Sequence, residues 1–172
     1  DFKISQTELQ SSIDAVMAER TKVDSSQMQL ETGEELNRGQ LRFKILMHTF
    51  DEIAKELKID VTSSQIGAKK ATILESVGGE AELPKNLVNA AIALQDFDTY
   101  VRAIVISEQI SQALSQSGVA AVEVSAQVSE LLTAKAKTLG VKVNPRYGAW
   151  DNEAGDVVAA NVTGDAVKPS AK

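Results

Sequence analysis

The chain has 172 residues with a formal net charge of −6 at pH 7, and 43% of its residues are hydrophobic but only 4% are aromatic. A chain of this length forms one domain that buries roughly 70% of the surface exposed by the unfolded chain. The charges are interleaved without a basic stripe, which argues against nucleic acid as the main ligand. Cysteine is absent, which excludes a disulfide framework and a thiolate metal site, and no apolar run approaches the ~20 residues that cross a bilayer.

The first helix and the loop after it are predicted from local patterns. Ser5 and Glu8 fit a capping box, in which the hydroxyl and the carboxylate each accept a hydrogen bond from a free amide at the start of a helix. Residues 21–34 are polar without clear periodicity, so we expect a mobile loop there. This loop carries Met28 and Leu30, whose polar surroundings make them candidates for exposed contact with a partner.

A second, longer helix is predicted over residues 35–57. Its apolar side chains recur at helical spacing and form a stripe wide enough for a central helix that packs on more than one side. The aromatic and methionine side chains of the stripe fit two roles, core packing or the lining of a groove for varied partners. The stripe consists of Leu41, Ile45, Leu46, Ile53 and Leu57, widened by Phe43, Met47 and Phe50.

Two further helices are predicted from a cap and from helix-breaking residues. Thr62 and Gln65 repeat the capping-box pattern, and Gly78 ends the helix that they open, because glycine adopts the left-handed conformation without steric cost. Pro84 suits the first turn of a short helix that runs to residue 94, since a helix needs no amide donor at that position.

The last two helices are predicted in the same way. Asp98 is the expected cap of a helix that stops near Gly118. The final helix is predicted over residues 122–139, with Gly140 as its terminating residue. After this glycine the hydrophobic pattern changes to period two, which is typical of a strand.

The two ends of the chain are predicted to meet in a small sheet. Val141 and Val143 alternate with polar residues, and a turn over residues 151–155 allows residues 156–159 to return as a hairpin strand. The segment 2–4, directly before the first helix, is the expected partner strand. We therefore predict a mostly α fold of about six helices, with a small β-sheet formed by the N-terminal strand and a C-terminal hairpin.

Several segments of the chain match a known pattern in their order and spacing. They are Lys3, Ile4, Ser5 and Leu9, then residues 38–46 and 53–62, then Phe97, Tyr100, Arg102 and Glu108, and finally residues 143–150. Together they resemble the SurA N-terminal domain family, and the last segment is similar to the ending of actinobacterial exported lipoproteins of that group. The resemblance covers residues 1–160, which we expect to form the domain, and residues 161–172 are predicted to be a disordered tail.

The resemblance implies a SurA-like chaperone arm, akin to the arms of trigger factor, that holds unfolded or newly exported polypeptides outside the cytoplasm. SurA and PrsA also carry parvulin prolyl-isomerase modules, and no segment of this chain fits one, so isomerase activity is not expected. The chain begins at Asp1 without Met, so we expect that an upstream piece was removed, and the group implies membrane attachment only through a lipid anchor upstream. We expect a monomer or a dimer that exchanges terminal strands.

Few side chains of the chain could support chemistry. His48 is the only histidine and lies among apolar neighbours, so a structural role is favoured over base catalysis, which needs a nucleophile and an orienting partner. The acidic stretches lack the spacing of a calcium loop, so we predict no metal site, no cofactor and no enzymatic activity. Tyr147 and Trp150 either seal the sheet onto the last helix or form an aromatic recognition platform.

Two functions are hypotheses at this point. The first is a non-catalytic holdase for unfolded or newly exported polypeptides, whose acidic surroundings are expected to disfavour acidic clients. The alternative is a dedicated lipoprotein adaptor that recognises one folded envelope partner through residues 21–34 or residues 147–150. The candidate peptide-binding residues are Met28, Leu30, Phe43, Met47, Phe50, Tyr147 and Trp150.

Overall fold

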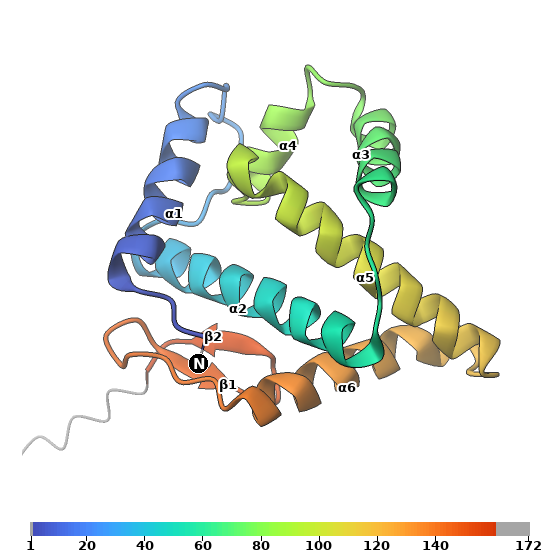
Figure 1. Ribbon diagram of the computed structural model, residues 1–172. Helices are drawn as coiled ribbons and strands as arrows, with labels where there is room; N and C mark the ends of the chain where they lie inside the picture. Colours follow the sequence, from blue (N-terminus) through green and yellow to red (C-terminus); the bar gives the residue numbers. More distant parts are fainter. Residues whose placement is uncertain (1, 161–172) are drawn as a thin grey trace, which may run out of the picture.

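The computed structural model describes residues 2–160, and it is mostly helical, with a small antiparallel hairpin at the end of that range (Figure 1). This confirms the predicted fold class of about six helices with a C-terminal hairpin. The tail predicted over residues 161–172 lies outside the described residues. The elements are α1 (Gln6–Arg20), α2 (Gly33–Leu57), α3 (Ser63–Val77), α4 (Leu83–Asn89), the 3-10 turn η1 (Leu94–Asp96), α5 (Phe97–Gln116), α6 (Ala121–Leu139), β1 (Ala149–Asp151) and β2 (Asp156–Val158).

Both predicted capping boxes are present. At the start of α1 the Glu8 amide donates to Ser5 Oγ over 3.1 Å, and the Ser5 amide donates to the Glu8 carboxylate over 2.7 Å. At the start of α3 the Gln65 amide donates to Thr62 Oγ1, and the Thr62 amide donates to Gln65 Oε1. Each box satisfies two amides that the helix itself leaves without acceptors, which fixes where the helix begins.

Two predicted boundaries around α4 and α5 are wrong. The short helix ends at Asn89 and not at residue 94, because Ala91 adopts a positive φ of 53° and turns the chain so that Ile92 is buried. The cap of α5 is Asp96 and not Asp98, since the turn η1 runs directly into that helix. The predicted stops at Gly78 and Gly140 are confirmed, with φ values of 94° and 63°.

The helix α2 lies at the centre of the molecule, with α1 at one end, α5 on one side, and α6 and the hairpin on the other (Figure 1). It contributes to all four hydrophobic clusters, so the predicted wide stripe is confirmed as a surface that packs on several sides. One predicted member of the stripe, Leu57 at the end of the helix, is 51% exposed. The cluster members from α2 are Leu36, Leu41, Phe43, Ile45, Phe50, Ile53 and Ala54.

A buried polar contact joins three segments of the fold. Ser12 Oγ on α1 donates to Gln40 Oε1 on α2 over 2.7 Å, and Gln40 Nε2 donates to the carbonyl oxygen of Ala91 over 2.7 Å. Ser12 and Gln40 are each only 2% exposed. Because a buried polar group without a partner is costly, this pair of bonds sets how α1 and the turn after α4 sit on α2.

The prediction of an N-terminal strand is wrong. The described part of the chain holds a two-stranded sheet, in which Trp150 lies opposite Val157, and residues 2–4 do not join it. A turn separates residues 141–143 from the hairpin, because the Tyr147 amide donates to the Asn144 carbonyl oxygen. Side chains hold the N-terminal segment in place, since Ile4 packs on the cluster around Val157 without a backbone ladder.

We predict that Gln40→Leu lowers the free energy of unfolding by about 2–4 kcal/mol, because it removes the partner of the buried Ser12 hydroxyl and of the half-buried Ala91 carbonyl oxygen. Urea unfolding followed by circular dichroism measures the change. The exposed substitution Gln116→Leu is the control and should change stability by less than about 0.5 kcal/mol. Adding Ser12→Ala to the Gln40→Leu variant should recover part of the loss, and equal stability of Gln40→Leu and the wild type would contradict this role.

We also predict a pH-dependent gain of stability in Asp96→Asn. Burial raises the pKa of the Asp96 carboxyl, with Lys44 opposing the shift, and one carboxyl oxygen is buried without a partner among the described residues. A raised pKa in the folded state means that stability is lost as the pH rises through that pKa. The Asp96 side chain makes no capping hydrogen bond, so asparagine has none to replace. The variant should therefore unfold at higher urea than the wild type at about pH 7, and this advantage should shrink below about pH 4. A constant difference at both pH values would show that the charge is not responsible.

Candidate functional site

A groove of about 680 Å³ lies between the N-terminal segment and the chain that follows α6. Its volume lies within the range of about 300–1,000 Å³ that is common for ligand sites. Segment 2–6 forms one wall, residues 139–147 form the other, and α1 and α2 supply the floor. We call this recess the terminal groove, and its floor consists of Leu9, Leu41 and Ile45, which are 2%, 7% and 5% exposed.

Local sequence explains the wall formed by residues 139–147. Gly140 ends α6 in the left-handed conformation and lets the chain leave the helix in an extended course. Val141 and Val143 are half-buried and pack on the floor, whereas Lys142 and Asn144 are exposed. The predicted alternation of apolar and polar residues is therefore present in this wall, although the wall is not a strand of the sheet.

The main chain on both sides of the terminal groove lacks backbone partners. Neither the amides nor the carbonyl groups of residues 141–143 take part in a backbone hydrogen bond within the described range of the chain. The same is true of residues 2–4 on the opposite wall. Extended segments with free amides and carbonyl groups can accept a further strand, as the edge of a sheet does.

The charges around the terminal groove are opposite in sign to the charge of the whole chain. Lys3, Lys142 and Arg146 line it, and no acidic side chain is among the described residues that do so. The Arg146 guanidinium lies 5.0 Å from the centre of the Tyr147 ring, which is a cation–π distance. The expectation that acidic surroundings disfavour acidic clients therefore does not fit this recess, since the net charge of −6 is carried elsewhere on the surface.

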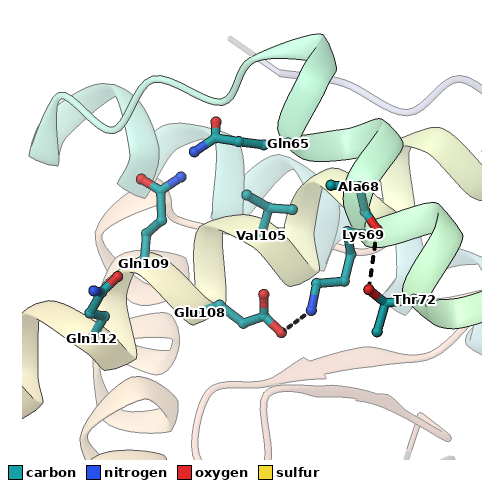
Figure 2. Close-up of a pocket in the computed structure, with 8 residues that line it drawn as sticks. All are labelled: Gln65, Ala68, Lys69, Thr72, Val105, Glu108, Gln109 and Gln112. Atoms are coloured by element: carbon teal, nitrogen blue, oxygen red, sulfur yellow. Dashed lines mark hydrogen bonds and ion pairs between the residues drawn. The ribbon is translucent and has the colours of Figure 1, made fainter.

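A second, smaller recess of about 290 Å³ lies between α3 and α5 and is lined mainly by polar side chains (Figure 2). Lys69 of α3 and Glu108 of α5 form an ion pair at its edge. Gln109 lies in the same recess, and its amide nitrogen is buried without a partner among the described residues. The recess can supply hydrogen bonds, but it lacks the apolar floor and the free main chain of the terminal groove.

His48 lies outside the terminal groove lining and packs against the N-terminus. Its ring stacks on Phe2, with centroids 3.7 Å apart and planes inclined by 12°. Burial lowers the pKa of His48, which favours the neutral ring at pH 7. These contacts give the imidazole a packing role that helps to hold the N-terminal wall of the groove on α2.

The structure does not bring the seven predicted peptide-contact residues together. Phe43 packs in the cluster shared with α4 and α5, and Phe50 packs in the cluster shared with α5 and α6. Tyr147 and Trp150 pack around the hairpin, and of these two only Tyr147 lines the terminal groove. The remaining three, Met28, Leu30 and Met47, are half-buried and are not part of the lining.

Sequence reasoning missed most of the terminal groove. Phe2, Ile4, Val141 and Val143 line it, yet the sequence analysis placed their segments in a closed sheet. The alternation after Gly140 was the available signal, because it marks an extended segment with one apolar face. The sequence held no signal that the opposite wall would stay unpaired, since that depends on the turn at residues 144–147.

No family model matches the chain, and neither a curated protein nor a solved structure matches it. Among residues 2–160, histidine and acidic side chains do not gather in a group of three that could hold a metal ion. None of the helices in that range combines the length and the apolar character needed to cross a membrane. The terminal groove is therefore the feature from which a function can be inferred.

Proposed function

We propose that this domain is a holdase, which binds extended segments of unfolded polypeptides in the terminal groove. The observation that carries the proposal is the free main chain of residues 141–143 beside an apolar floor. A bound segment can pair with that main chain whatever its sequence, since every residue except proline offers an amide and a carbonyl group. Apolar side chains of the segment gain affinity by leaving water for the floor.

The geometry suits strand addition. In an extended peptide, alternate side chains point to opposite faces, so every second residue would face the floor formed by Leu9, Leu41 and Ile45. The hydrogen bonds supply affinity that is independent of sequence, and the floor supplies a preference for apolar residues. Binding of this kind is weak for a short segment, which allows a holdase to release its client.

The wider setting of the proposal rests on the resemblance to SurA N-terminal domains. On that basis we propose an extracytoplasmic protein of the cell envelope, attached through a lipid anchor upstream and without prolyl-isomerase activity. Its clients would be newly exported polypeptides before they fold. The terminal groove supports this proposal in one respect, since it suits extended chains better than folded surfaces.

A dedicated adaptor for one envelope protein is the second candidate. It is favoured by a hydrogen bond that ties the loop over residues 21–32 to α1, in which Arg20 Nη1 donates to the carbonyl oxygen of Glu31 over 2.8 Å. A loop anchored in this way presents a fixed surface, and fixed surfaces suit recognition of a single folded partner. Met28 and Leu30 are apolar side chains of that surface, although each is half-buried.

We predict that equimolar protein slows the aggregation of several unrelated unfolded clients, measured by light scattering. Val143→Ser should weaken this protection by about threefold in effective affinity, since burying the exposed half of a half-buried valine contributes roughly 0.7 kcal/mol. Val122→Ser is the matched control, because Val122 is 87% exposed and lies away from the groove. Circular dichroism should show that both variants are folded.

The double variant Met28→Ser and Leu30→Ser separates the two candidate functions. Protection that survives in this variant and weakens in Val143→Ser supports the terminal groove as the client site. Absence of protection by the wild-type protein would overturn the holdase proposal. A pull-down from envelope extract that recovers one stoichiometric partner, lost in the loop variant, would then support the adaptor.

A further inference from the structure

We propose that the terminal groove selects extended apolar segments that carry carboxylate side chains. The inference rests on the proposed function and names the class of peptide that the groove prefers. It depends on three basic side chains, which lie on both walls of a recess in an otherwise acidic protein.

The basic side chains are free to meet a ligand. Lys3 on one wall, and Lys142 and Arg146 on the other, are exposed, and none of them forms an ion pair within residues 2–160. By contrast, eight other basic side chains within residues 2–160 form ion pairs, one of them Arg42 with Asp156 on the nearby β2 strand. Unpaired charges of one sign around an apolar recess raise the local concentration of ligands of the opposite sign.

The alternation of apolar and polar residues in segment 141–143 predicts where the carboxylates of a bound peptide would lie. Val141 and Val143 face the floor, and Lys142 between them faces solvent. A strand paired with this wall has the same alternation, so its apolar residues face the floor when its intervening residues lie beside Lys142. Glutamate or aspartate at those intervening positions would contact Lys142 and approach Lys3 or Arg146 on the rim.

A peptide fits these features better than an anionic lipid does. A lipid would use the apolar floor and the basic rim, but its acyl chain would leave the amides and carbonyl groups of residues 141–143 without partners. A peptide strand uses the apolar floor, the basic rim and the unpaired main chain of residues 141–143. The occupant that we assign is therefore a peptide in which apolar and acidic residues alternate.

The test compares three labelled peptides with the same apolar residues, alternating Val-Glu, Val-Gln and Val-Lys, by fluorescence anisotropy with the wild-type protein. We expect the Val-Glu peptide to bind about tenfold more tightly than the Val-Gln peptide, and the Val-Lys peptide to bind most weakly, since each exposed ion pair contributes a factor of a few. Raising the ionic strength to about 0.5 M should remove the difference, because exposed charges are then screened.

The triple variant Lys3→Gln, Lys142→Gln and Arg146→Gln should bind the Val-Glu and Val-Gln peptides equally. A charge-matched control variant replaces with glutamine three lysines that do not line the groove, namely Lys58, Lys85 and Lys137. This variant should keep the preference for the Val-Glu peptide over the Val-Gln peptide.

Equal binding of the three peptides by the wild type would overturn the acidic preference and leave the holdase proposal intact. Binding of none of them would overturn both proposals. Preference for the Val-Glu peptide that survives in the triple variant would place the selective charges elsewhere. Two results together would assign the terminal groove to a lipid and overturn its assignment to a peptide. These are displacement of the Val-Glu peptide by vesicles of anionic phospholipid and no binding of the Val-Gln peptide.

Discussion

The packing of α2 on several sides is the constraint on which the rest of the structure depends. Different elements cover different faces of this helix, so its apolar side chains are divided among four clusters. The buried bonds of Gln40 to Ser12 and Ala91 then set how α1 and the turn after α4 meet it. The part of α2 that lines the terminal groove is the turn that carries Leu41 and Ile45.

The terminal groove follows from how the two ends of the chain cover that turn of α2. Both ends reach it through side chains, Ile4 from one and Val141 and Val143 from the other. Within residues 2–160, neither end supplies the other with backbone hydrogen bonds. The result is an apolar floor between two extended walls whose main chain is free. The basic residues on those walls come from distant parts of the sequence, so their shared surface is a property of the fold and gives the groove a charge opposite to that of the whole protein.

Features set by neighbouring residues could be predicted from the sequence, and features set by distant ones could not. The Ser5 and Thr62 capping boxes and the stop at Gly140 depend on local hydrogen bonds and backbone freedom, and all three are confirmed. The choice of Asp96 over Asp98 depends on the turn that precedes α5. The prediction of an N-terminal strand failed for the same kind of reason, because the turn after residue 143 separates the expected partner, segment 141–143, from the hairpin. The aromatic residues predicted as contacts are partly buried and pack against three different clusters. A wide apolar stripe does not show which of its faces borders a recess.

The most direct test of peptide binding by main-chain pairing is amide hydrogen exchange of residues 141–143, resolved by NMR, with and without the alternating Val-Gln peptide. In the free protein these amides should exchange rapidly, because they lack backbone partners. In the complex, alternate amides of this segment should become protected while those of α2 keep the same rates, since one edge of an extended segment pairs with one strand. Peptide binding that leaves the exchange of residues 141–143 unchanged would contradict strand addition at the terminal groove.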